Sequence, residues 1–187
     1  MKKLLFSMLL ILASVQARAT IINFDLKGVA GNGLLPGNEP GTIIGGTGGE
    51  IGSGITFNDV TLALTINVGW GSSQGFTDLS SAASASHIHG PTAANNGSGF
   101  TQTAGVLFTL TRSSNAVTGG TLTTAPITLT ASQATDLNNG KFYINIHTAN
   151  NGGGELRGFL IPAVPEPGTA SLLGLGALVF VARRRRG

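Results

Sequence analysis

Histidine is the residue type whose spacing in this sequence points most directly to chemistry. The 187-residue chain has three histidines, in two short segments: His87 and His89 flank Ile88, and His147 lies much further along. Residues two apart in a β-strand share a face, so His87 and His89 point together while Ile88 points into the opposite layer. Three convergent imidazoles suit copper or zinc, with a fourth coordination position left to water or Glu155.

The segment around His147 alternates between apolar and polar residues, as a half-buried strand does. Its apolar residues are Phe142, Ile144 and Ile146, and its polar residues are Tyr143, Asn145 and His147. If residues 148–154 form a hairpin loop, the simplest register keeps Ile146 opposite Leu156. The same register sets His147 opposite Glu155, and Asn145 opposite Arg157. We therefore expect Glu155 to orient His147, with Arg157 beside them.

Two interpretations of these polar residues remain open. In one, the histidines, Glu155 and Arg157 form a hydrogen-bonded polar seam that fixes two strands without a metal. In the other, His87, His89 and His147 bind a single copper or zinc ion. Catalysis is less favoured, because the chain lacks a nucleophile context such as G-x-S-x-G and a glutamate near a histidine also occurs in ordinary ion-pair networks. The absence of cysteine excludes disulfides and zinc–thiolate sites.

The net charge of +3 comes from the two ends of the chain. Between Thr20 and Val164 there are four cations and seven acids, a net charge of −3. Sequence-independent nucleic-acid binding depends on Lys and Arg replacing phosphate counterions, so we exclude nucleic acid as a partner. The length allows one domain with appendages.

The first 19 residues have the parts of a secretory signal peptide. Lys2 and Lys3 precede an apolar run from Leu4 to Val15, and the segment from Ala17 to Ala19 is a small-x-small cleavage site. The run is shorter than the roughly 20 residues that span a bilayer, which argues against a permanent anchor. We predict cleavage by signal peptidase after Ala19.

The C-terminal segment has a proline break, an apolar stretch from Ala170 to Ala182 and a cationic cluster. The break contains Pro165, Glu166 and Pro167, and the cluster is Arg183, Arg184, Arg185 and Arg186. The arginines should stay cytoplasmic, which makes the tail a short, transient transmembrane anchor. These three parts resemble the PEP-CTERM sorting signal of Gram-negative bacteria that make exopolysaccharide. The resemblance implies an inner-membrane-anchored intermediate, recognition by an exosortase, and delivery to the cell surface or extracellular matrix, with exopolysaccharide or other matrix components as partners.

The region between the two ends reads as short β-prone runs separated by glycine- and asparagine-rich turns. The expected strands are Ile21–Val29, Gly49–Phe57, Val60–Val68, Ala83–His89, Val106–Thr111, Ala125–Leu129, Phe142–His147 and Glu155–Ile161. Seven or eight such strands predict an all-β fold, an antiparallel Greek-key-like β-sandwich. One short helix is expected over Thr130 to Leu137, where Thr130 and Gln133 have capping-box spacing. Gly41 to Gly54 lacks the context of a phosphate-binding loop, so we interpret it as loops and turns.

Three motifs in this region carry a further resemblance: H-I-H-G-P at residues 87–91, N-I-H-T at 145–148 and G-E-L-R-G at 154–158. Together they resemble the CHRD domain, a module first named in chordin and common in exported bacterial proteins. The resemblance covers most of Ile21 to Ile161 and implies that the histidine segments share one domain. We predict a signal peptide at 1–19, a CHRD-like domain at 20–163 and a sorting segment at 164–187.

The histidine segments also show a fainter similarity to copper–zinc superoxide dismutase. In that resemblance His87, His89 and His147 stand for three copper ligands, and Arg157 for an anion-guiding arginine. The chain lacks a fourth histidine to bridge to zinc, so dismutase activity is not expected. The sequence therefore favours an exported, non-enzymatic surface or matrix module, with a mononuclear copper or zinc metalloprotein as the alternative.

Overall fold

The computed structural model describes residues 19–93, 100–113 and 117–163. Its strands are β1 Ile21–Gly28, β2 Gly31–Asn32, β3 Gly48–Asn58, β4 Ala63–Trp70, β5 Ala83–His89, β6 Val106–Thr109, β7 Gly120–Thr123, β8 Ile127–Thr128, β9 Tyr143–Thr148 and β10 Leu156–Pro162. Its helices are the 3-10 helices η1 Pro36–Asn38 and η2 Ser72–Gln74 and the α-helix α1 Ala131–Asn138. The predicted all-β fold with one short α-helix is confirmed.

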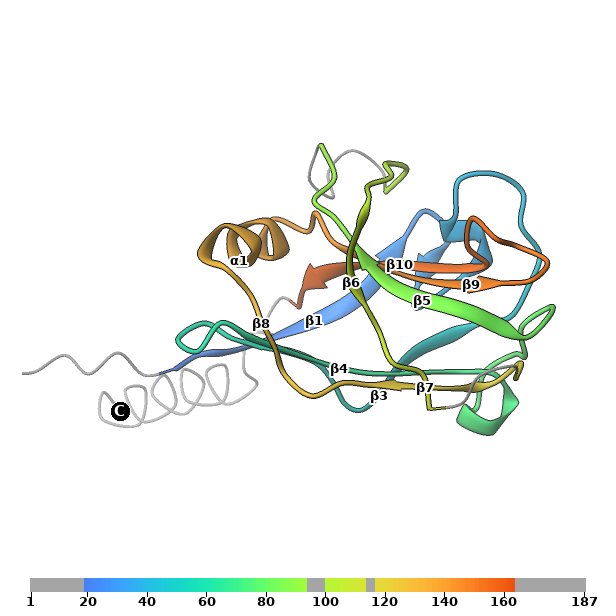
Figure 1. Cartoon of the computed structure of the whole chain (residues 1–187), viewed down its shortest axis with the longest axis horizontal. Coiled ribbons are helices and arrows are strands. Elements are labelled where there is room, and N and C mark those ends of the chain that lie inside the picture. Colours follow the sequence, from blue (N-terminus) through green and yellow to red (C-terminus); the bar gives the residue numbers. More distant parts are fainter. Residues whose placement is uncertain (1–18, 94–99, 114–116, 164–187) are drawn as a thin grey trace, which may run out of the picture.

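The strands pair antiparallel in the order β6-β5-β9-β10-β1-β3-β4-β7, with β2 beside β1 and β8 beside β4. Figure 1 shows β3, β4 and β7 on one side of the molecule and β5, β9 and β10 on the other. The sheet curls until its ends meet, because Arg112, beyond β6, forms an isolated bridge with Leu122 of β7. The pairing also makes β5 and β9, the two strands that carry the histidines, direct neighbours.

The curled sheet encloses one apolar core with contributions from both sides. Fully buried side chains of this core include Trp70 and Phe57 from one side and Ile88, Ile144 and Ile146 from the other. Burial of each such side chain stabilises the fold by about 1.5–3 kcal/mol. Because Ile88 and Ile146 face this core, the residues that alternate with them, including the three histidines, lie on the outer face of the sheet.

The helix α1 begins with the predicted capping box. Thr130 Oγ1 accepts a hydrogen bond from the backbone N–H of Gln133 at 3.2 Å, and Gln133 Oε1 accepts one from the Thr130 N–H at 2.8 Å. These two bonds satisfy backbone donors that a helix start leaves unpaired. The buried Ala134 and Leu137 then pack one face of the helix on the core.

The strand expected at Val60–Val68 begins later than predicted. The side chain of Asn58 accepts hydrogen bonds from the backbone N–H groups of Val60 and Thr61, at 3.0 and 2.9 Å, and so forms a turn where a strand was expected. The β4 strand therefore starts at Ala63 and extends to the buried Trp70.

The strand predicted at Gly49–Phe57 is β3, which runs from Gly48 to Asn58, so the glycine-rich segment Gly41 to Gly54 is only partly loop. The β3–β4 ladder is irregular between Glu50 and Ile55, where Gly52 and Gly54 adopt φ of +56° and +66°. Glycine tolerates these angles at no steric cost, so the strand can contain residues that look like a turn. The short strands β2 and β7 were also not predicted.

Both expected targeting segments lie outside the described residues, apart from Ala19 at the end of the N-terminal one. Among the helices of the described ranges, none is both long enough and apolar enough to cross a membrane.

Candidate metal centre

The three histidines come together because β5 and β9 pair directly. In this ladder His87 lies opposite Asn145, and Ala85 lies opposite His147. His87 and His147 are thus diagonal neighbours on one face, a separation that long side chains bridge. His89 lies two residues beyond His87 on the same face, as the sequence predicted.

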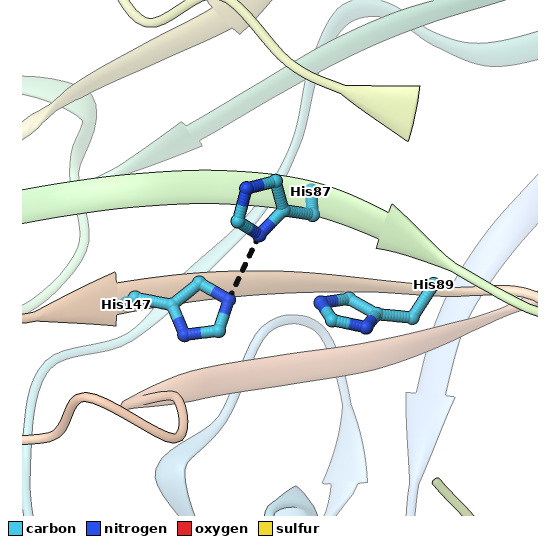
Figure 2. Close-up of side chains that lie close together, drawn as sticks. All are labelled: His87, His89 and His147. Carbon is cyan, nitrogen blue, oxygen red and sulfur yellow. Dashed lines mark hydrogen bonds between the residues drawn. The ribbon is translucent and has the colours of Figure 1, made fainter. Parts of the chain in front are cut away.

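The imidazoles converge on one another rather than pointing separately to solvent (Figure 2). One ring nitrogen from each histidine lies within 4.8 Å of the other two. The closest approach, 3.0 Å, joins His87 Nδ1 and His147 Nε2. Nitrogen ligands bind zinc at about 2.0–2.1 Å, so one ion could contact all three rings after small side-chain movements.

Two backbone carbonyls determine which nitrogen each ring presents. His89 Nδ1 lies 2.9 Å from the carbonyl oxygen of Ala104, and His147 Nδ1 lies 2.9 Å from that of Gly152. A carbonyl oxygen only accepts, so in both rings Nδ1 carries the hydrogen and Nε2 keeps its lone pair. Metal-binding histidines are commonly held in this way by a backbone carbonyl on the other nitrogen.

The nitrogen that His89 directs toward the other two histidines is Nε2. This atom is buried and has no hydrogen-bond partner. Figure 2 shows the ring of His89 directed toward the other two histidines. A buried nitrogen without a partner is uncommon in proteins, and a metal ion shared with His87 and His147 would satisfy its lone pair. The residues present therefore fit a metal with three imidazole ligands.

The surroundings favour the neutral imidazoles that metals require. Burial lowers the pKa of His87, and His147, His89 and Arg112 lower it further. Burial also lowers the pKa of His89, against the opposing hydrogen bond to the Ala104 carbonyl. Both rings are thus neutral at pH 7, and little proton competition opposes binding.

Arg157 and Asn145 lie opposite each other, in the register that the sequence predicted. Arg157 is fully buried, with its guanidinium carbon 3.8 Å from the ring centre of Tyr143 and 4.8 Å from that of Phe159. Its Nη2 donates to the carbonyl oxygen of Gln102, in the segment that covers this face. Burial lowers the pKa of Arg157, opposed by Tyr143 and Glu39. The outer face of β9 and β10, which the sequence predicted to be polar, is thus covered at Arg157 by the segment that contains Gln102.

Glu155 does not orient His147, and this expectation is wrong. The Glu155 carboxylate is fully buried and accepts hydrogen bonds from Ser80, Thr148 and Asn151 and from the backbone N–H of Gly46. Residue 155 precedes β10, so the alternation of the strand does not fix its direction. The potential metal ligands brought together by the described structure are the three histidines, without Glu155.

Sequence reasoning also missed contributors to this face. The carbonyls of Ala104 and Gly152 hold two histidines, but a backbone carbonyl leaves no signal in residue type. Glu39 is buried near Asn145 and Arg157, and its distance along the chain hid it. Only its type, an acid in a glycine- and proline-rich stretch, could have drawn notice.

Comparison with known proteins gives two matches to family models. A model described as the CHRD domain matches residues 37–160. A model described as the PEP-CTERM protein-sorting motif matches residues 163–186. Searches of curated proteins and of solved structures found no match.

Proposed function

Because the chain belongs to the CHRD-domain family and ends in a PEP-CTERM sorting motif, we propose that it is an exported surface or matrix protein that binds one copper or zinc ion. The ligands are His87, His89 and His147. The observation that carries this proposal is the convergence of three ring nitrogens within 4.8 Å, two of them on rings fixed by backbone carbonyls.

The sorting motif indicates that the protein is exported. A PEP-CTERM motif is processed by an exosortase during export, after a membrane-anchored intermediate. The final location, on the cell surface or in the extracellular matrix, is part of our proposal. So is contact with exopolysaccharide or other matrix components, which this route supplies as neighbours.

Copper and zinc suit the ligands better than other common metals do. Imidazole is a borderline ligand that favours copper, zinc, iron and nickel, and affinities of divalent ions peak at copper. The three histidines would hold the ion and leave a fourth position for water. A copper ion there would supply one-electron chemistry, and a zinc ion a Lewis acid. The chain's own contribution is to orient the rings, to keep those of His87 and His89 neutral by lowering their pKa, and to exclude water from His89.

A metal-free seam is the second candidate, favoured by the hydrogen bond of 3.0 Å between His87 and His147. Since His147 Nε2 keeps a lone pair, His87 Nδ1 must donate that bond. The module would then serve as a binding or structural unit whose histidines tie β5 to β9. The two candidates differ in what happens when metal is offered, so one titration separates them.

Titration calorimetry with Cu(II) and Zn(II) on the full chain, purified through a tag without histidine, tests the proposal. We expect one ion per chain and a loss of at least about tenfold in affinity for His87→Ala, His89→Ala or His147→Ala, since even partners of ligands contribute about that much. Affinity should fall as the pH drops below about 6.5, because protons compete for the imidazoles.

The control variant is Asp59→Asn. The Asp59 side chain accepts a hydrogen bond from the Thr20 N–H and does not belong to the histidine cluster. This variant should bind metal like the wild type. Binding that ignores His147→Ala, or no binding beyond surface uptake, would leave the metal-free seam as the function of these residues.

A further inference from the structure

Residues 100–105 cover part of the outer face beside the histidines, and we call this segment the strap. Phe100 and Ala104 of the strap are partly buried against the outer apolar cluster of Tyr143, Phe159 and Ile161. The exposed residues of the strap are Thr101, Thr103 and Gly105. A segment with so few buried apolar side chains has low local stability, so its polar contacts decide how firmly it docks.

Tyr143 of β9 contacts both the strap and a histidine. Its hydroxyl donates to the Ala104 carbonyl oxygen at 3.3 Å and accepts a hydrogen bond from the Ala104 N–H at 3.2 Å. Its ring stacks on the ring of His89, with centres 4.9 Å apart and planes inclined by 5°. His89 Nδ1 donates to the same Ala104 carbonyl oxygen at 2.9 Å. Tyr143 therefore holds the ring of His89 and also the carbonyl that fixes the hydrogen on that ring.

The strap is also attached on both sides of Ala104. Arg157 Nη2 donates to the carbonyl oxygen of Gln102, and the Gly90 N–H donates to that of Gly105 at 3.1 Å. The strap begins at Phe100 with φ of +61°, a left-handed conformation that a residue with a side chain adopts at a cost in free energy. The contacts of the strap must outweigh this strain, so the loss of one of them should loosen it.

A metal ion on His89 Nε2 would act on the strap through the imidazole ring. The ion withdraws electron density from the ring, so Nδ1–H becomes a stronger donor to the Ala104 carbonyl, as donors that carry positive charge are. In the other direction, the carbonyl orients the ring and raises its basicity toward the metal. Coupling between two binding equilibria is reciprocal, so metal binding and strap docking must strengthen each other by the same factor.

We propose that Tyr143 is a positioning residue for the metal centre and that, through Ala104, it couples docking of the strap to metal binding at His89. Metal binding tightens the strap, and a loosened strap weakens metal binding. The inference rests on the proposed metal-binding function. It adds to that function a residue that no ligand contacts and a surface segment whose stability depends on the metal.

The first measurement is calorimetric titration of the full chain with Zn(II), using the variant Tyr143→Phe. This substitution keeps the ring that stacks on His89 and removes both hydroxyl hydrogen bonds to Ala104. We expect one ion per chain, bound at least about fivefold more weakly than by the wild type, the lower end of typical coupling between sites. The matched control is Thr103→Ala, an exposed position on the same strap, which should bind zinc like the wild type.

The second measurement separates positioning from a general effect on the fold. Nitrogen-15 NMR of the histidine rings in the metal-free chain, at a pH above the histidine range near about 6.5, shows which nitrogen carries the hydrogen. Tyr143→Phe should lower the fraction of His89 rings with hydrogen on Nδ1. His147 is the internal control, because its Nδ1 partner is the Gly152 carbonyl, outside the strap, and its ring should not change. A purely structural role of Tyr143 would not shift His89 alone.

The third measurement needs no variant, so it decides the matter even where Tyr143→Phe fails to fold. Saturating Zn(II) should slow hydrogen exchange of the Ala104 amide in the wild type at least about fivefold, by the same reciprocity. Zinc binding that leaves this exchange unchanged, or full zinc affinity in Tyr143→Phe, would overturn the inference while the metal-binding function stands. A wild-type chain that binds no metal would refute the proposed function and this inference together.

Discussion

Glu39 is an acid in an environment that opposes its charge. Burial raises its pKa from 4.5 to about 7, and the positive charge of Arg157 only partly offsets that effect. The unfolded chain therefore releases this proton at a lower pH than the folded chain does. Between these two values the folded state binds more protons, so stability must fall as the pH rises.

Glu39→Gln should remove that contribution. A pKa raised from 4.5 to about 7 corresponds to about 3 kcal/mol lost between pH 4.5 and 7, and an amide has no proton to release there. Denaturant unfolding across this range, in the absence of metal, should show that the free energy of unfolding of the variant increases relative to that of the wild type as the pH rises. The buried histidines act alike in both proteins, so the difference between the two isolates Glu39. A constant difference at every pH would contradict the raised pKa.

At the scale of the strand, the two faces of β9 have different roles. Ile144 and Ile146 enter the core, while Asn145 and His147 lie on the outer face. The second face is covered as well: Tyr143 packs with Phe159 and Ile161 in a small separate cluster, with Phe100 of the covering segment. Packing of the core thus depends on one set of alternate residues and the site on the other.

Substitutions on the two faces of β9 should have opposite effects. Ile146→Asp places an unpaired carboxylate in the core, which costs several kcal/mol and is comparable to the whole stability of a domain, so the protein should unfold. His147→Ala should stay folded, because it removes a side chain from the outer face. Thermal melts followed by circular dichroism give the ranking, and the reverse order would mean that the faces are misassigned.

Glu155 ties the connection between β9 and β10 to the segments that precede β3 and β5. Burial raises the pKa of this carboxyl, but hydrogen bonds from Ser80, Gly46 and Thr148 outweigh that effect and leave the pKa lowered. A carboxylate with a lowered pKa contributes stability above its unfolded pKa and loses it as the pH falls through the folded value. One side chain thus anchors segments that are distant in sequence.

Glu155→Gln should destabilise the protein by about 2–4 kcal/mol near pH 7, because an amide group cannot accept every bond that the carboxylate accepts. Urea unfolding measures this change. The loss should shrink toward acidic pH, where the wild-type carboxyl is protonated too. Metal stoichiometry should stay the same, since Glu155 does not belong to the histidine cluster. Loss of metal binding in a folded Glu155→Gln variant would restore the rejected role as orienting partner.

In the molecule as a whole, the first and last strands of the described domain are neighbours, so its two ends lie close together. Phe24 near the start of β1 pairs with Pro162 at the end of β10, and the Ala163 N–H donates to the Asn23 carbonyl at 2.8 Å. The predicted signal peptide and the sorting segment are therefore connected to adjacent strands. The histidine face does not include these attachment points, so changes to the tail should leave the domain intact.

Replacing Arg183, Arg184, Arg185 and Arg186 with glutamine should impair retention and processing of the tail, because the arginines hold its end on the cytoplasmic side. Cell fractionation and mass determination of the mature chain measure the outcome. The melting temperature of the purified variant should equal that of the wild type. Normal processing and surface delivery of the neutral variant would contradict this role of the arginines.

Short-range patterns determined much of this protein. Alternation around Ile88 and Ile146 fixed which residues face the core, because successive side chains in a strand point to opposite faces. The loop of residues 148–154 fixed the pairing of Asn145 with Arg157, since a short hairpin leaves few registers that keep apolar residues together. Thr130 and Gln133 fixed the start of α1 through bonds that span three residues. Each of these features depends on neighbours along the chain.

Tertiary structure decided how the three predicted histidines are brought together and which groups surround them. The pairing of β5 with β9 joins segments that no local rule connects, and the carbonyls of Ala104 and Gly152 reach the histidines only after the sheet has curled. Likewise, Glu39 becomes a buried acid only because η1 docks on β10. Glu155 turned away from His147 because its partners include the Gly46 and Ser80 backbone and the Ser80 hydroxyl, which lie in distant loops, and long-range contacts of this kind leave no periodicity in the sequence.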